Sequence, residues 1–374
     1  MPEIHAARRE RARQQVAEAG ADAAFITSGP NVRYLSGLAS SNAALLLLAS
    51  GSGVSAVLAT DSRYALAAER DCPDLELVIE RFIEPRLAAE MTRRSLRIVA
   101  FEAHEMSVER HGELAAKAEG VQLVPFGRKI EELRTAKDPS ELELLATACR
   151  ISGQAIADVF VLIRPGLTER QLAAALDRRM VELGAERPAF DTIVASGPNG
   201  AIPHHSPTSR PLRRGDLVTM DFGALYGGYH ADMTRTVALG EPAGWQREIY
   251  ELVAAAQQAG IQAARPGTDV ADVDAAARDL IREAGHGEHF GHGLGHGVGL
   301  EVHEAPTIGY ARTGKLAHRV PITVEPGVYL PGRGGVRIED VLVVGAGGTG
   351  LLTTTTRELL VLLPGDRTWP PRTT

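Results

Sequence analysis

Short apolar runs and polar, helix-like segments alternate along the first part of the chain. Residues 8–19 predict a polar helix that ends at Gly20, because glycine commonly stops a helix. Three apolar runs follow, separated by Gly, Asn and Ser: Ala23–Ile26, Ala43–Ala49 and Val54–Leu58. Such runs are typical of strands. The pattern predicts a strand-rich α/β domain over residues 1–127.

A clear helix start marks where a second domain begins. Asp138 is a good N-cap, Pro139 suits the first helical turn, and Glu141 stands three residues after the cap. We therefore predict a linker over residues 128–138 and a second domain over residues 139–374.

The second domain repeats one order of elements. Two helical segments are joined by Arg164–Thr168, and about a hundred residues later two more are joined by Arg265–Thr268. The threonine that ends each connection is the predicted N-cap of the next helix. Each pair is followed by strands that carry two acidic residues: Asp221 and Asp232, then Glu325 and Glu339. This order predicts two pseudo-symmetric halves with a site between them.

The first pair of acidic residues belongs to a predicted hairpin. Two strand patterns flank the dipeptide Gly227-Gly228: residues 217–223 and 229–237. The two glycines fit a two-residue turn, which needs positive φ, and this register places Asp221 opposite Thr234. Asp232 is then diagonal to Asp221 on the same face, roughly 7–8 Å away. Like charges this close are costly unless a cation lies between them, although a solvated polar face has the same alternation.

Histidines are concentrated in the last third of the chain. Six of the 12 lie between His286 and His318, and three of these stand in the glycine-rich stretch 291–304: His292, His296 and His303. So many glycines exclude a simple helical zinc pair, and they leave the imidazoles exposed to a cavity. Of the adjacent pair His204-His205, the second imidazole is expected to face solvent.

Two further carboxylates complete a candidate metal site. Glu325 ends a predicted strand before Pro326, and Glu339 shares a strand face with Arg337. A buried glutamate beside an arginine is commonly a plain ion pair. Four carboxylates with histidine nevertheless form an oxygen-rich set that suits Mn²⁺, Co²⁺ or Zn²⁺. Two such ions, ~3.5–4 Å apart, would activate a water molecule.

Composition narrows the class of protein. The net charge of −7 argues against a nucleic-acid binder, and the two cysteines are too few for a disulfide framework or a thiolate zinc site. The N-terminus lacks the apolar core of a signal peptide, and Ala43–Ala49 is far shorter than a membrane span. We expect a cytoplasmic protein without membrane or nucleic-acid partners.

Together these residues resemble the creatinase/prolidase/methionine-aminopeptidase family of pita-bread metallopeptidases. The resemblance covers nearly all of residues 139–364 and rests on five segments: Met220–Gly223, His230–Thr236, Gly291–Gly297, Val324–Gly327 and Arg337–Asp340. The first domain, with Asn31–Gly37 and Thr60–Tyr64, is similar to the small first domain of prolidases and Xaa-Pro aminopeptidases. The resemblance implies an α+β chain, in which a creatinase/prolidase-type α/β domain precedes a pita-bread domain with pseudo-two-fold halves.

The resemblance also implies ligands for two divalent metal ions, with Mn²⁺ expected ahead of Co²⁺ or Zn²⁺. By the family's pattern, Asp232 and Glu339 bridge the ions. Asp221 completes the shell of one ion, and His296 and Glu325 complete that of the other. A metal-bridged hydroxide would then attack the carbonyl before proline.

The remaining roles are likewise implied by the resemblance. Glu325 would act as a proton shuttle. His204 and His303 would hold the substrate and stabilise the developing oxyanion. His292 would line the site, and Arg337 would orient a ligand carboxylate or the substrate terminus.

The implied activity is hydrolysis of the Xaa-Pro bond in small peptides that have proline at the second position. The first domain is compatible with a dipeptidase or an aminopeptidase, and a homodimer is expected. Two other functions compete with this one: a catalytically silent pita-bread binding protein, and a metal-free creatinase-like amidinohydrolase. Retention of all five ligand residues weighs against both.

Overall fold

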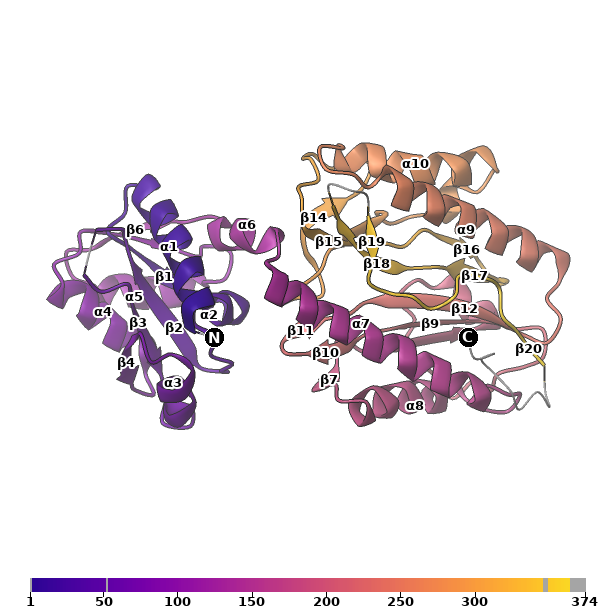
Figure 1. Cartoon of the computed structure of the whole chain (residues 1–374), viewed down its shortest axis with the longest axis horizontal. Coiled ribbons are helices and arrows are strands. Elements are labelled where there is room, and N and C mark those ends of the chain that lie inside the picture. The colour runs from indigo at the N-terminus through magenta and orange to yellow at the C-terminus, as the bar shows by residue number, and fades with distance from the viewer. Residues whose placement is uncertain (1, 52, 346–348, 364–374) are drawn as a thin grey trace. The chain divides into compact units, whose positions relative to one another are not determined.

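The computed structural model describes residues 2–51, 53–345 and 349–363. The chain divides into two compact units, Met1–Arg134 and Thr135–Thr374. The division falls inside the predicted linker 128–138, where the structure has a helix, α6 (Lys129–Thr135). The two units are described separately (Figure 1).

The first unit is built on a six-stranded sheet in the order β4-β3-β2-β1-β5-β6. Its central pairs β1/β2 and β2/β3 are antiparallel, whereas the outer pairs are parallel. The strands are β1 (Ala23–Ile26), β2 (Ala43–Leu48), β3 (Ala56–Thr60), β4 (Glu76–Ile79), β5 (Ile98–Phe101) and β6 (Gln122–Pro125). The helices are α1 (Pro2–Glu18), α2 (Gly29–Ser36), α3 (Ala65–Asp71), α4 (Ile83–Arg93) and α5 (Val108–Lys117). The predicted α/β character of this unit is confirmed.

The first half of the second unit begins with the predicted helix start. Asp138 caps α7 (Pro139–Val159), and Glu141 completes a reciprocal capping box. The helix continues as a 3₁₀ turn, η1 (Phe160–Leu162), and then α8 (Glu169–Glu182) begins at its predicted cap, Thr168. These helices share a hydrophobic core with the sheet β20-β12-β9-β8. The strands of this half are β7 (Arg187–Pro188), β8 (Ile193–Ser196), β9 (Leu217–Phe222), β10 (Ala224–Tyr226), β11 (Tyr229–His230) and β12 (Met233–Leu239), with η2 (Gly197–Ala201) after β8.

The second half repeats this arrangement. The helices α9 (Gly244–Ala263) and α10 (Val270–Glu283) share a second core with the sheet β14-β13-β15-β18-β19. In Figure 1 they lie on one side of this unit, and α7 and α8 lie on the other. The remaining elements are η3 (Gly287–His289), β13 (Gly295–Gly297), β14 (Glu304–Ile308), β15 (Val320–Val324), β16 (Gly327–Leu330), β17 (Gly334–Arg337), β18 (Asp340–Val344), β19 (Gly350–Leu351) and β20 (Val361–Leu362). The predicted α+β fold with two similar halves is confirmed.

The hairpin has the predicted register but is bent. Thr234 faces Asp221, and the turn glycines Gly227 and Gly228 have φ of +58° and +83°. Each predicted long strand is interrupted, because its outer end joins β7 in a second sheet. Gly223 permits the bend, since a Cβ there would lie only 1.7 Å from the carbonyl oxygen of Ala231. Close backbone approach of this kind requires glycine.

Two predicted helix starts were wrong. Helix α1 begins at Pro2 rather than near residue 8. Helix α10 has Asp269 as its N-cap rather than Thr268, and Asp269 makes no side-chain capping bond. An isolated bridge between Asp269 and Lys315 holds the extended backbone there, so tertiary pairing fixes this end.

One helical stretch among the described residues, Pro139–Leu162, is long and apolar enough to cross a membrane by length and composition alone. Half of its apolar window is buried inside the structure, and core helices pass the same test. The finding is therefore weak evidence for a membrane span.

Candidate metal centre

The two halves of the second unit meet at a group of buried and half-buried acidic side chains. Asp221 comes from β9, Asp232 precedes β12, and Glu325 follows β15. Glu339 lies between β17 and β18, where its N–H donates to the carbonyl oxygen of Thr234 at 3.1 Å. This backbone bond joins the acidic segment of one half to that of the other.

Two of these acidic side chains and His296 converge closely enough to hold one metal ion. Asp232, His296 and Glu339 are buried, and each offers a ligand atom within 4.8 Å of the other two. The Nε2 atom of His296 is 3.3 Å from Glu325 Oε1 and 3.7 Å from Asp232 Oδ2. The structure thus brings His296 together with Asp232, Glu325 and Glu339. Asp221 lies close enough to Asp232 for the two charges to repel.

Two buried carboxylate oxygens are left without a hydrogen-bond partner among the described residues: Asp221 Oδ1 and Glu339 Oε1. A buried polar atom without a partner is costly. A divalent cation would satisfy both oxygens, and carboxylate and imidazole are suitable ligands for Mn²⁺, Co²⁺ or Zn²⁺. The residues present therefore fit the implied metal.

The pKa values of the carboxyl groups in the cluster also indicate that a cation is needed. Burial, followed by repulsion from neighbouring carboxylates, raises the pKa of Asp232 and of Glu339 well above its usual value. Burial also raises the pKa of Asp221 despite the nearby Arg337. Carboxyl groups in such a site stay ionised at neutral pH only if a cation compensates their charge.

His296 and Glu325 form an opposite case. Burial would raise the pKa of Glu325, but the hydrogen bond with His296 and the positive charges of His296, His292 and Arg337 together lower that pKa to about 2. Burial would lower the pKa of His296, yet the contact with Glu325 raises that pKa to about 9. Without a metal this pair is an ion pair, and a metal ion would replace the proton of the imidazole.

Arg337 connects the cluster to its surroundings. Its Nη2 donates to Asp221 Oδ2 at 2.7 Å, and its Nε donates to Thr234 Oγ1 at 3.1 Å. The Thr234 hydroxyl in turn donates to Glu339 Oε2 at 2.7 Å. The ion-pair partner of Arg337 is therefore Asp221, and the plain Arg337–Glu339 pair considered from the sequence is not formed.

A tyrosine that sequence reasoning missed extends this network. The Nη1 of Arg337 donates to the Tyr329 hydroxyl at 2.8 Å, and that hydroxyl lies 2.9 Å from His292 Nε2. The Nδ1 of His292 is 2.8 Å from the Gly293 carbonyl, which requires the proton on Nδ1. The tyrosine hydroxyl therefore donates to Nε2. Burial and hydrogen bonding cannot be read from the sequence, so no local signal marked Tyr329.

A threonine supports the histidine side of the cluster and was also missed. The Thr323 hydroxyl accepts from the His296 N–H at 3.0 Å and donates to Glu325 Oε1 at 3.2 Å. It thereby fixes the spacing of the two side chains. Its place two residues before Glu325 on β15, on the same strand face, was the signal.

The other predicted histidines lie around the cluster. His204 and His303 are exposed, and the ring of His303 lies 4.4 Å from that of His296. His292 is half-buried. The expectation for His205 was wrong, because its imidazole is buried and its Nε2 lies 2.9 Å from Glu169 Oε2. Its acceptor is supplied by a helix 36 residues earlier in the chain, which no local pattern reveals.

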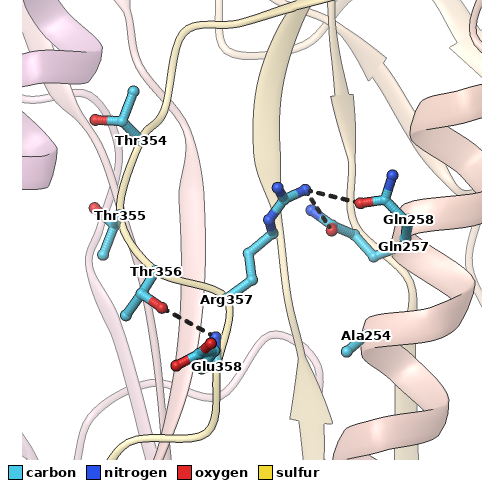
Figure 2. Close-up of a pocket in the computed structure, with 8 residues that line it drawn as sticks. All are labelled: Ala254, Gln257, Gln258, Thr354, Thr355, Thr356, Arg357 and Glu358. Carbon is cyan, nitrogen blue, oxygen red and sulfur yellow. Dashed lines mark hydrogen bonds between the residues drawn. The ribbon is translucent and has the colours of Figure 1, made fainter.

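A separate cavity of about 430 Å³ lies where α9 faces residues 354–358 (Figure 2). Arg357 reaches across it, and its Nη1 makes only long contacts of 3.5 and 3.4 Å with Gln257 and Gln258. Behind them, Gln257 donates to Asp340, the residue after Glu339. None of the predicted site residues lines this cavity.

Comparisons with known proteins identify the family of both units. Residues 143–346 match the model of metallopeptidase family M24, and residues 8–136 match that of the creatinase/prolidase N-terminal domain. The Xaa-Pro dipeptidase of Pyrococcus horikoshii is 38% identical over 342 residues, which cover 91% of this chain and 94% of the relative.

Solved structures resemble the whole chain. The Xaa-Pro dipeptidase of Bacillus anthracis has a TM-score of 0.91 at 35% identity, covering 96% of this chain and 100% of that one. The X-Pro aminopeptidase of Thermotoga maritima has a TM-score of 0.86 at 35% identity, covering 93% and 99%.

Proposed function

The chain belongs to metallopeptidase family M24, and we propose that it hydrolyses the bond before proline in Xaa-Pro dipeptides or at Xaa-Pro peptide N-termini. The observation that carries this proposal is the buried cluster in which Asp221 and Glu339 each keep a carboxylate oxygen without a partner among the described residues. Relatives named Xaa-Pro dipeptidase and X-Pro aminopeptidase supply the substrate class.

Two divalent ions, with Mn²⁺ as first choice, would be held by five side chains: Asp221, Asp232, His296, Glu325 and Glu339. Asp232 and Glu339 are the proposed shared ligands, which their position at the centre of the cluster supports. When bound, the ions supply Lewis acidity and an activated water. The raised pKa values of Asp232 and Glu339 support a need for this positive charge.

The protein side chains around the ions bind substrate and move protons. Glu325 takes a proton from the attacking water and delivers it to the proline nitrogen as the bond breaks. His204 and His303, both exposed beside the cluster, donate to the carbonyl oxygen on which charge develops. His292 lines the site, and Arg337 orients the Asp221 carboxylate.

Selectivity for proline follows from what such a site does not require. The nitrogen of an Xaa-Pro bond carries no N–H, so a peptidase that needs this donor loses a contact. A site that holds the carbonyl oxygen through histidines and metal ions binds the imide equally well. We further propose a cytoplasmic homodimer as the working form.

The test is hydrolysis of Ala-Pro and Ala-Pro-Ala by the protein loaded with Mn²⁺, Co²⁺ or Zn²⁺, together with metal analysis. Turnover that disappears on chelation and returns with metal is expected. Preference for Ala-Pro identifies a dipeptidase, and preference for Ala-Pro-Ala an aminopeptidase. A protein that binds no metal and turns over neither peptide is the silent binding protein. Hydrolysis of creatine without added metal would instead establish the amidinohydrolase.

A further inference from the structure

A buried carboxylate outside the cluster accepts hydrogen bonds from residues on both sides of His204. Glu169 is the first residue of α8, and its side chain has no exposed surface. Its two oxygens accept three hydrogen bonds each, all of 2.7–3.0 Å, from side-chain or backbone donors of four residues: Ser196, Asn199, His205 and Thr208. A carboxylate is the side chain that offers this many acceptor sites, because it donates nothing.

His204 itself is exposed, but the chain is anchored on both sides of it. The preceding carbonyl, that of Pro203, accepts from Arg337 Nη1 at 3.2 Å, and Arg337 also binds Asp221. The following side chain, His205, is anchored to Glu169. The loop that presents His204 is thus tied to the ligand cluster at one end and to the start of α8 at the other.

We propose that Glu169 is a positioning residue for the peptidase reaction, acting through His205 to hold the backbone from which His204 meets the substrate. This inference rests on the proposed function. An imidazole on an exposed loop would otherwise lose conformational freedom when it binds the substrate carbonyl. Displacement of a catalytic group by about 1 Å can cost ~10²-fold in rate, so a fixed backbone is a requirement of the role.

The first test is Glu169→Gln in a double-mutant cycle with His204→Ala. An amide has one acceptor oxygen and one donor group, so three of the six donors lose their acceptor. We expect kcat/KM for the preferred Xaa-Pro peptide to fall about 10–100-fold, as is typical of residues that support an active group. In the His204→Ala background the same substitution is expected to change kcat/KM less than twofold, because the group that it positions is already absent.

Glu141→Gln is the matched control. Glu141 is also a buried glutamate in the first turn of a helix of this unit, and it accepts from Tyr229 Oη at 2.8 Å. We expect it to lower thermal stability without changing kcat or KM. If Glu169→Gln merely destabilised the fold, its effect would resemble that of Glu141→Gln and would multiply with that of His204→Ala.

A second pair of variants covers the case in which Glu169→Gln does not fold. His205→Phe removes one of the six donors, and His205→Gln restores an N–H near the position of Nε2. Loss of kcat/KM in the first and recovery in the second support the inference. Multiplicative effects in the cycle, or an unchanged rate for His205→Phe, overturn it. Failure of the proposed function is separate, because the wild-type protein would then hydrolyse no Xaa-Pro peptide.

Discussion

Removal of one hydroxyl, by Tyr329→Phe, tests whether the network around Arg337 contributes to catalysis. Burial raises the pKa of Tyr329 to about 12, so its hydroxyl is protonated at neutral pH and can serve both Arg337 and His292. The substitution deletes both hydrogen bonds without changing the ring.

The expected magnitude follows from the bonds that remain. Arg337 keeps its bond to Asp221 at 2.7 Å, and its Nη1 keeps the Pro203 carbonyl at 3.2 Å. The Nη1 donor of Arg337 therefore still has an acceptor. The free energy lost with the Tyr329 hydroxyl should lie at the low end of the ~1.5–3 kcal/mol typical of a hydrogen bond to a charged group. A loss of about 1.5 kcal/mol corresponds to roughly tenfold in kcat/KM.

The assay is steady-state hydrolysis of Ala-Pro at saturating Mn²⁺, with metal content and thermal unfolding measured on the same samples. Tyr250→Phe is the matched control, because Tyr250 is also buried, also has its pKa raised to about 12, and donates to the Arg357 carbonyl at 3.0 Å. Equal kcat/KM in the two variants would refute a catalytic contribution of the Tyr329 hydroxyl.

Three further predictions concern single groups. Asp232→Asn is expected to reduce bound metal and to lower kcat/KM by more than the ~10–100-fold typical of a supporting residue, and metal analysis with normal content would contradict the assignment. Burial raises the pKa of Cys72 to about 11 and also raises that of Cys149, so a disulfide reagent at pH 8 should label neither thiol until the chain unfolds. Burial alone would raise the pKa of Glu169, but the hydrogen bonds that its carboxylate accepts together lower that pKa to about 2. Its stabilisation is therefore complete above its usual value of ~4.5 and is lost as pH falls towards 2, so between pH 5 and 3 wild type should lose more unfolding free energy than Glu169→Gln.

The parts of the fold that the sequence predicted are those with local causes. A Gly-Gly turn determines which residues pair beside it, so the position of Thr234 opposite Asp221 followed from the turn alone. The capping box at Asp138 and Glu141 is likewise complete within four residues. The break in the hairpin at Gly223 has a distant cause, because it depends on β7. Tertiary pairing likewise overrode the N-cap expected at Thr268.

The residues of the candidate site likewise fall into those that the sequence could predict and those that it could not. Residues that would touch metal or substrate have chemically distinctive types and stand in motifs, so the sequence could nominate them, although their roles remain predictions. Tyr329 and Thr323 contribute a single hydroxyl each, and side chains that carry a hydroxyl (Ser, Thr and Tyr) are common throughout the chain. Their contacts distinguish them, and the sequence offers only the spacing of Thr323 from Glu325 as a signal. Glu169 was not considered for the same reason.

The two exposed histidines of the second unit are supported by contacts of one kind. The loop before β14, in the second half, carries His303. Directly after it, Glu304 accepts a hydrogen bond of 2.6 Å from buried Lys137, which stands just before α7. In the first half, Glu169 holds His205 directly after His204. Each exposed histidine is thus followed by a residue whose side chain is tied to a buried charge near the start of a helix. An arrangement in which each imidazole stays accessible while the next residue is fixed suits the role proposed for His204 and His303, which is to donate to one carbonyl oxygen from opposite halves. By this argument Glu304→Gln should reproduce the loss expected for His205→Phe, and the effects of the two variants on kcat/KM should multiply.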